Sequence, residues 1–303
     1  MIFKTRTEPI EMTILGLLNN RMTLVEKDKQ HYHNLVKGYG GEVMFDSLTE
    51  KLDGHHYILN DLLLESNNSK FQIDSLMISP EPLYLFEVKN YEGDFYFENG
   101  RFYTIAKKEI KNPLLQLERS ESLLRQLLQD LGYRISIEAF VVFINPGFTL
   151  YQAPLNKPII YPNQLPRFLK KISSRPSTLS TRHKSLAEQL VSLHQRDFPY
   201  DRLPSYDFDS LRKGMNCRLC HSFMVRVHGR YLVCEVCGHK EEIDNAILRA
   251  VDEMMLLLPA MKISTNRVRD WCQVVDSTKT IRRVMKQHYP TVGKKEFSFL
   301  YSK

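Results

Sequence analysis

The first half of the chain contains short apolar runs that are typical of strands. These runs, rich in leucine, isoleucine and aromatic residues, occupy residues 56–64, 71–79 and 83–89. Two aromatic-rich runs, 94–98 and 101–105, flank Asn99-Gly100, a pair that favours a tight β-hairpin. The pattern therefore predicts several strands of a sheet.

The most clearly marked helix follows these strands. Asn112 is a good N-cap residue, Pro113 suits the first helical position, and an apolar stripe recurs at the helical period until Gly132. The stripe consists of Leu114, Leu117, Leu124, Leu128 and Leu131. A buried strand is expected over residues 137–144. Strands, a helix and a further strand in one sheet predict an α/β fold.

Changes in pattern divide the chain into six expected segments. They are a helical arm (1–36), an α/β domain (37–160), a helical extension (161–200), a linker (201–213), a cysteine-rich module (214–242) and a helical C-terminal module (243–303). The glycine-rich run from Lys37 to Gly41 is expected to interrupt the helical arm, and a new helix is expected from Glu42 to about residue 52.

Composition places the chain among ordinary globular proteins. It has 303 residues, of which 43% are hydrophobic and 25% charged, which excludes a disordered or collagen-like chain. The longest apolar run, residues 254–261, is far shorter than the ~20 residues needed to cross a bilayer. The polar N-terminal residues do not form the core of a signal peptide. We therefore expect a cytoplasmic protein that is not embedded in a membrane and whose thiols are reduced.

Positive charge is concentrated in the last third of the chain. The net charge is +7, and residues 201–303 contain 18 Lys and Arg against 12 Asp and Glu, which gives +6 for this part. Such an excess suits a polyanion, because neutralising phosphates releases bound counterions. A basic surface that serves solubility alone is the other interpretation.

Three charged residues at strand ends suggest a metal site. Glu87 and Lys89 lie two residues apart in an apolar strand, so their side chains share one face. Burying charges there is unfavourable unless they are paired or bind a ligand. Asp74, on a neighbouring strand, can bring a second carboxylate close to Glu87 and so form an oxygen-rich site for Mg²⁺. A salt bridge that only supports the sheet is the alternative.

Asp74 followed by Glu87-Val88-Lys89 resembles the active-site signature of the PD-(D/E)xK nuclease superfamily. More narrowly, residues 37–150 resemble the nuclease-related domain (NERD) family. The motifs that carry this resemblance are Gly41-Glu42, Gln72-Ile73-Asp74, Glu87-Val88-Lys89-Asn90 with Gly93, and Gln116. The superfamily signature has proline where this chain has Ile73.

The resemblance implies a restriction-endonuclease-like mixed sheet flanked by helices. It also implies that Glu42, Asp74 and Glu87 surround a divalent metal, Mg²⁺ or Mn²⁺, and that Lys89 contacts the scissile phosphate or the attacking water. Gln116 would orient part of the site.

The favoured function is metal-dependent hydrolysis of nucleic acid, with DNA as the expected substrate, in DNA processing or defence. A bound metal activates water and neutralises charge on the phosphate, and Lys89 adds a further positive charge. The alternative is a non-catalytic nucleic-acid-binding or regulatory protein that uses its C-terminal modules. A third interpretation is a zinc-stabilised adaptor between proteins.

Four cysteines have the spacing of a zinc ribbon. Cys217-x-x-Cys220 and Cys234-x-x-Cys237 are separated by thirteen residues that read as a β-hairpin. Two such pairs supply four thiolates for a tetrahedral Zn²⁺, which leaves no coordination position for water and so indicates a structural metal. Cys272 is expected in a hydrophobic core.

The C-terminal module has the pattern of a winged helix-turn-helix. Two short helices are expected over residues 264–274 and 277–288, followed by a strand over 296–301 in the place of a wing. The second helix offers four cations to nucleic acid: Lys279, Arg282, Arg283 and Lys286. A helical cap packed on the zinc module is the alternative.

Overall fold

The computed structural model describes residues 1–52, 56–174, 178–195, 202–289 and 299–300. The chain forms two compact units, and each draws on two separate stretches of sequence. The first unit comprises Met1–Pro9 and His33–Pro199, and the second comprises Ile10–Tyr32 and Tyr200–Lys303. None of the described helices is both long enough and apolar enough to cross a membrane.

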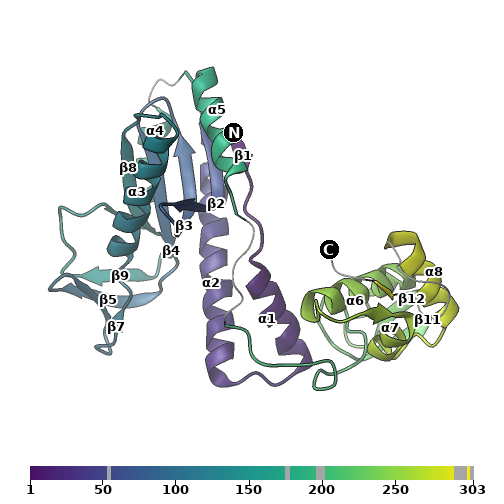
Figure 1. The fold of residues 1–303 in the computed structure, drawn as a ribbon. Coiled ribbons are helices and arrows are strands. Elements are labelled where there is room, and N and C mark those ends of the chain that lie inside the picture. Colours follow the sequence, from purple (N-terminus) through teal and green to yellow (C-terminus); the bar gives the residue numbers. More distant parts are fainter. Residues whose placement is uncertain (53–55, 175–177, 196–201, 290–298, 301–303) are drawn as a thin grey trace. The chain divides into compact units, whose positions relative to one another are not determined.

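A six-stranded mixed sheet forms the centre of the first unit (Figure 1). The hairpin β2–β3 and strand β4 pair antiparallel, whereas β1 beside β2, β8 beside β4 and β10 beside β8 pair parallel. The strand order is β1 (Ile2–Lys4), β2 (Tyr57–Ser66), β3 (Ser69–Ile78), β4 (Leu83–Lys89), β8 (Ile137–Phe143) and β10 (Ile159–Ile160). The predicted α/β class and mixed sheet are confirmed.

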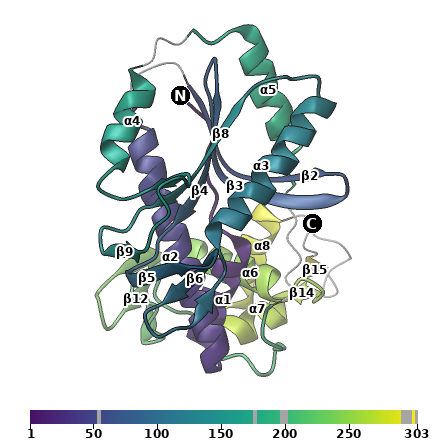
Figure 2. The ribbon, with the colours of Figure 1, turned by 90° about the vertical axis from the view of Figure 1, so that its left-hand side faces the viewer.

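Helices cover both faces of this sheet (Figure 2). α2 (Glu26–Thr49) and α4 (Leu165–Ser173) lie on one face, where the rings of Phe45 and Phe86 are 5.0 Å apart. α3 (Pro113–Asp130) and α5 (Thr181–Ser192) lie on the other face and share a core with the strands. The sheet is therefore buried on both sides, which explains the nearly continuous apolar character of its strands.

A second, four-stranded sheet extends the first unit. Its order is β7 (Glu109–Ile110), β6 (Arg101–Thr104), β5 (Gly93–Glu98) and β9 (Phe148–Tyr151). Asn99 and Gly100 form the predicted hairpin turn, with φ angles of 50° and 79°. Positive φ at both positions is what a tight hairpin turn requires, so the Asn-Gly signal was correct.

The termini of α3 follow the sequence signals. The Asn112 side chain accepts the backbone N–H of Leu114 at 2.9 Å, and Pro113 is the first helical residue. Gly132, just beyond the last turn, has a φ of 79°, a conformation that glycine adopts without strain. The helix thus begins and ends where the sequence predicts.

The glycine-rich run does not interrupt a helix, so that expectation was wrong. α2 continues from Glu26 to Thr49 through Gly38, Gly40 and Gly41. Glycine lowers helix stability by about 1 kcal/mol but does not end a helix when packing favours continuation. At Gly41 the packing needs glycine, because a Cβ there would lie 2.4 Å from the Cβ of Asn90.

The second unit combines α1 with the C-terminal elements. Leu18 of α1 lies in the same core as Met254 and Trp271. Its helices are α1 (Ile10–Arg21), α6 (Ile243–Leu257), α7 (Thr265–Cys272) and α8 (Thr278–His288). The expected arm of residues 1–36 is therefore shared, with β1 in the first unit and α1 in the second.

Arg21 fixes α1 within the second unit. Its side chain is 1% exposed and forms two hydrogen bonds of 2.7 Å with the carboxylate of Glu253 on α6. The guanidinium also lies 4.0 Å from the centre of the Trp271 ring. These contacts place α1 in the core of the unit, and removing Arg21 would leave the Glu253 carboxylate buried and unpaired.

The order of α6, β14 (Ile263–Ser264), α7, α8 and β15 (Phe299–Leu300) is that of a winged helix. β14 and β15 pair antiparallel, as the first strand and the wing do in that fold. The expected helices of the C-terminal module are therefore present, and its winged-helix-like character stays a prediction. Of the expected strand 296–301, residues 296–298 and 301 lie outside the described residues.

Candidate active site and metal centre

Asp74 and Glu87 lie where β3 and β4 stop pairing. The ladder between the two strands reaches Ser75 and Phe86. One residue further, Oδ2 of Asp74 accepts the backbone N–H of Val88 at 2.8 Å. The Asp74 side chain therefore takes the place of a main-chain acceptor. This contact fixes a carboxylate beside Glu87.

Lys89 connects Glu87 with the start of α3. Its Nζ donates a hydrogen bond to Oε1 of Glu87, whose side chain is 1% exposed. The same Nζ lies 3.4 Å from Oε1 of Gln116, in the first turns of α3. The expected sharing of one face by Glu87 and Lys89 is therefore observed, and Gln116 lies beside them.

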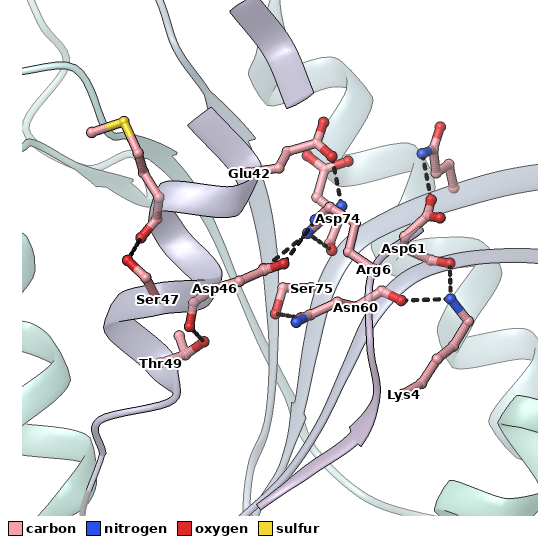
Figure 3. Close-up of polar contacts among 12 residues, drawn as sticks. Lys4, Arg6, Glu42, Asp46, Ser47, Thr49, Asn60, Asp61, Asp74 and Ser75 are labelled. Atoms are coloured by element: carbon pink, nitrogen blue, oxygen red, sulfur yellow. Dashed lines mark hydrogen bonds and ion pairs between the residues drawn. The ribbon is translucent and has the colours of Figure 1, made fainter. Parts of the chain in front are cut away.

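Glu42 reaches the site from α2 and is held by Arg6, a residue that the sequence patterns did not predict to be part of the site. Figure 3 shows the Arg6 guanidinium among Glu42, Asp46 and the strand that carries Asp74. Arg6 forms an ion pair with Glu42 through Nη1, and its Nε lies 2.9 Å from Oδ2 of Asp46. Its Nη2 donates to the carbonyl oxygen of Asp74 at 2.7 Å.

β2 has a local irregularity opposite Asp74. Asn60 pairs with Ser75 and Leu62 with Ile73, and Asp61 between them has a φ of 55°. A non-glycine residue with positive φ inside a strand marks a distorted ladder. The pairing of β3 with both of its neighbouring strands is therefore irregular at Asp74. The carbonyl of Asp74 is thus available to Arg6, and its side chain is available to the backbone N–H of Val88.

The carboxylates of the site have strongly perturbed ionisation. Burial, together with the charge of Asp74, raises the pKa of Glu42 and of Glu87 to about 8. Burial also raises the pKa of Asp74. Burial acts against the charged form of Lys89, but Glu87 and Asp74 outweigh it and raise the pKa of this amine. The site holds more negative charge than its own cations neutralise.

The donor atoms of this site suit a hard divalent cation. Glu42, Asp74 and Glu87 offer carboxylate oxygens, the ligands that Mg²⁺ and Mn²⁺ prefer. Among the described residues the close groups of potential metal ligands do not include these carboxylates, and each of the three contacts a protein group: Arg6, Val88 or Lys89. Raised carboxylate pKa values indicate that a cation would be favourable here.

The four predicted cysteine ligands converge in the second unit. The Sγ atoms of Cys217, Cys220, Cys234 and Cys237 all lie within 4.8 Å of one another. The pairs Cys217–Cys237 and Cys220–Cys234 have Sγ separations of 3.5 Å. Four sulfurs around Zn²⁺ at about 2.3 Å each lie about 3.8 Å apart. This cluster can therefore hold a metal such as zinc.

Two matching turns build this cluster. The N–H of His221 donates to the carbonyl of Cys217, and the N–H of Gly238 donates to that of Cys234, both at 3.0 Å. His221 and Gly238, each directly after a second cysteine, have φ angles of 58° and 72°. The hairpin of β11 (Val225–His228) and β12 (Tyr231–Cys234), together with β13 (Lys240–Glu242), completes a ribbon-like fold around the four cysteines.

The thiols influence one another electrostatically. Hydrogen bonding from the backbone of Cys237 lowers the pKa of Cys234 to about 7. The backbone N–H of His239 favours the Cys237 thiolate, but desolvation and the neighbouring cysteines outweigh it and raise that pKa to about 12. Several thiolates at this spacing would repel one another, and a metal ion bound between them would supply the compensating positive charge.

The four expected nucleic-acid contacts lie on one exposed face of α8. Lys279, Arg282, Arg283 and Lys286 are exposed, whereas Ile281, Val284 and Met285 are buried in the unit. Arg283 is partly engaged, because its Nη2 lies 2.7 Å from Oδ1 of Asp244. The other three cations are thus better placed to meet phosphates.

Three charged residues around Asp74, namely Arg6, Asp46 and Asp61, were not predicted from the sequence. Asp46 follows Glu42 by one helical turn, so the i, i+4 spacing was a usable signal once α2 was known. Asn60 and Asp61 are polar residues within an otherwise apolar strand, and this break in the pattern could also have indicated a site. No pattern in the sequence indicated Arg6, because its partners are 36 to 68 residues away along the chain.

The fold and this site define a mixed α/β domain with an acidic centre and a lysine at the ends of two strands. Residues 37–144 match a family described as the nuclease-related domain. This match agrees with the resemblance that the motifs in this part of the chain predicted. No curated protein and no solved structure matches the chain. Arg6 and the cysteine cluster lie outside the matched residues.

Proposed function

We propose that the protein hydrolyses phosphodiester bonds of nucleic acid, with DNA as substrate, at the site formed by Asp74, Glu87 and Lys89. The observation that carries the proposal is the buried Asp74, fixed on Val88 beside the Glu87–Lys89 pair, within a nuclease-related domain. A sheet salt bridge needs only one acid and one base. Two additional carboxylates, the buried Asp74 and the half-buried Glu42, favour a metal-dependent site.

In this hydrolysis a water oxygen attacks phosphorus, the P–O bond to the leaving oxygen breaks, and that oxygen takes up a proton. A divalent metal, Mg²⁺ or Mn²⁺, supplies a polarised water and neutralises phosphate charge when bound. Glu42, Asp74 and Glu87 would hold it. Lys89 places a positive charge beside the phosphate, and Gln116 orients the Lys89 amine through its side-chain carbonyl.

The second unit would bind the substrate. In this proposal Zn²⁺ occupies the four-cysteine cluster as a structural metal, and Lys279, Arg282, Arg283 and Lys286 contact phosphates. Cysteines that bind Zn²⁺ must stay reduced, so a cytoplasmic location is also part of the proposal.

The test is a cleavage assay on the full chain with single-stranded DNA, duplex DNA and RNA. Each substrate is offered with Mg²⁺, Mn²⁺, Ca²⁺ or a chelator. We expect cleavage of DNA with Mg²⁺ or Mn²⁺, and binding without cleavage with Ca²⁺. Glu87→Ala, purified identically, should lose activity by orders of magnitude, whereas Glu98→Ala, at an exposed position of β5, should not.

Two outcomes would redirect the proposal. Equal cleavage by Glu87→Ala and the parent protein would mean that the activity lies elsewhere or in a contaminant. Binding of DNA with no cleavage under any metal would favour the non-catalytic function, for which the exposed cations of α8 are the supporting observation.

A further inference from the structure

Arg6 is a buried cation outside the nuclease-related residues, and its side chain is 3% exposed. We infer that Arg6 is a positioning residue of the proposed nuclease site, which holds the carboxylate of Glu42 against the strand that carries Asp74. This inference rests on the proposed function. It adds the N-terminal segment to the site.

The contacts of Arg6 connect the helix and the strand that supply two carboxylates. Nε and Nη2 meet the two oxygens of Asp46 at 2.9 and 3.1 Å, a two-point contact that fixes the plane of the guanidinium. Nη1 then pairs with Glu42. Nη2 also reaches the carbonyl of Asp74 at 2.7 Å, so a single side chain sets the distance between α2 and β3.

The charges explain why a cation is needed at this point. Asp46 lies one helical turn after Glu42 on α2, and both side chains face the buried Asp74. Like charges on one side of a helix repel, and a third carboxylate opposite increases the repulsion. Without Arg6, Glu42 would gain by turning away from Asp74 toward solvent. A metal ligand would then be misplaced.

The buried ion pairs of Arg6 are not needed merely to anchor the N-terminal segment. β1 already pairs with β2, and Nζ of Lys4 donates to the carbonyls of Asn60 and Asp61 at 2.8 and 2.7 Å. A buried ion-pair network is also a poor source of stability compared with apolar packing. Groups that orient metal ligands, in contrast, typically change metal affinity or activity by about 10–100-fold when removed.

The experiment measures Mn²⁺ binding and catalysis on the full chain with its cysteine cluster loaded. Mn²⁺ alone is titrated by electron paramagnetic resonance into the parent protein, Arg6→Met, Arg6→Lys and the control Lys4→Met. We expect Arg6→Met to bind Mn²⁺ about 10–100-fold more weakly and to lose kcat, with an unchanged KM for DNA. Arg6→Lys should recover part of both, since an ammonium keeps the charge but not the two-point contact.

Lys4→Met should weaken thermal stability but keep Mn²⁺ affinity and kcat, because its partners are backbone carbonyls next to the site rather than the ligand carboxylates. Parent-like Mn²⁺ affinity and kcat in Arg6→Met would overturn the inference while leaving the proposed function intact. A parent protein that neither binds Mn²⁺ nor cleaves DNA would overturn the proposed function and this inference with it.

Discussion

The carboxylate of Asp74 accepts the backbone N–H of Val88 at 2.8 Å, and Val88 lies between two residues of the proposed site. Val88 separates Glu87 from Lys89, so this contact fixes the position of the Asp74 carboxylate relative to both residues. It also explains why β3 and β4 can separate at this point without leaving a buried donor unpaired. The same side chain therefore has a structural and a proposed chemical role.

These two roles can be separated by substitution. Asp74→Asn keeps an oxygen that can accept the Val88 N–H but removes the charge that a metal needs. We expect it to lose nuclease activity by orders of magnitude and to keep most of its stability. Asp74→Ala should lose activity and also about 1–3 kcal/mol of the free energy of unfolding in urea, since a buried donor is left unpaired. Equal stability of the two variants would contradict this assignment.

Gly41 offers a test of how closely α2 approaches the site. Gly41→Ala would place a Cβ 2.4 Å from the Cβ of Asn90, so α2 must shift and carry Glu42 with it. We expect a loss of about 1–3 kcal/mol in unfolding free energy and a lower kcat.

Gly40→Ala is the matched control, because nothing lies within 4 Å of an added Cβ there. It should raise helix stability by about 0.5–1 kcal/mol and leave kcat unchanged. A parent-like Gly41→Ala would mean that the close approach is not required.

Local signals in the sequence predicted several elements of the first unit and the cysteine ribbon of the second. Asn99-Gly100 set a turn, Asn112 and Pro113 set the start of α3, and the Cys-x-x-Cys pairs set the ribbon. Each depends on residues within a few positions of one another. The grouping of Asp74, Glu87 and Lys89 could also be predicted, because the alternation of side chains between the two faces of a strand depends only on neighbouring residues.

The features that were missed depend on contacts across the chain. Whether Gly41 ends a helix or permits close packing depends on Asn90, which lies on another element. The pairing of β1 with β2 places Arg6 next to α2, although no pattern within residues 1–36 indicates a strand. The assignment of α1 to the second unit follows from its buried partners, such as Glu253. Such relations follow from tertiary packing and not from propensity.

The raised carboxylate pKa values predict an unusual dependence of stability on pH. Glu42 and Glu87 have pKa values of about 8, above the ordinary 4.5, so the folded protein holds more protons than the unfolded chain between these values. Their contribution to stability is complete below about pH 4.5 and is lost as the pH rises through about 8.

Urea unfolding at pH 6 and pH 8 without divalent metal should therefore show a loss of unfolding free energy at the higher pH. Glu87→Gln should reduce this loss, since the amide does not ionise. Mg²⁺ should stabilise the parent protein more at pH 8 than at pH 6, because protons and metal compete for the same oxygens. An identical pH dependence in Glu87→Gln would contradict the assignment.

The cysteine cluster predicts about one tightly bound Zn²⁺ per chain, measurable by elemental analysis. Cys234→Ser should lose the metal and make residues 214–242 sensitive to protease, because Cys217 and Cys234 lie in the core of the second unit. Cys272→Ala is the matched control, since this buried cysteine is outside the cluster and should keep the zinc. Protein purified without chelators and free of zinc would contradict the prediction.

The exposed face of α8 predicts a specific pattern in the salt dependence of DNA binding. Each phosphate contact contributes about 0.9 to the slope of log K against log salt for duplex DNA. Lys279→Ala with Arg282→Ala should therefore reduce the slope by about two units. Arg283→Ala should reduce it by less, since Arg283 already pairs with Asp244 at 2.7 Å and must give up this partner to meet a phosphate.

The measurement uses the full chain, because Ile14 and Leu18 of α1 belong to the core of the second unit and a fragment beginning at residue 201 would lack them. Glu87→Gln serves as the background so that DNA is not cleaved during titration. Lys170→Ala with Lys171→Ala, an equally exposed pair of cations on α4, should leave the slope unchanged. Asp244→Ala should strengthen binding slightly by releasing Arg283. If both double variants lowered the slope equally, binding would reflect the overall positive charge and not the face of α8.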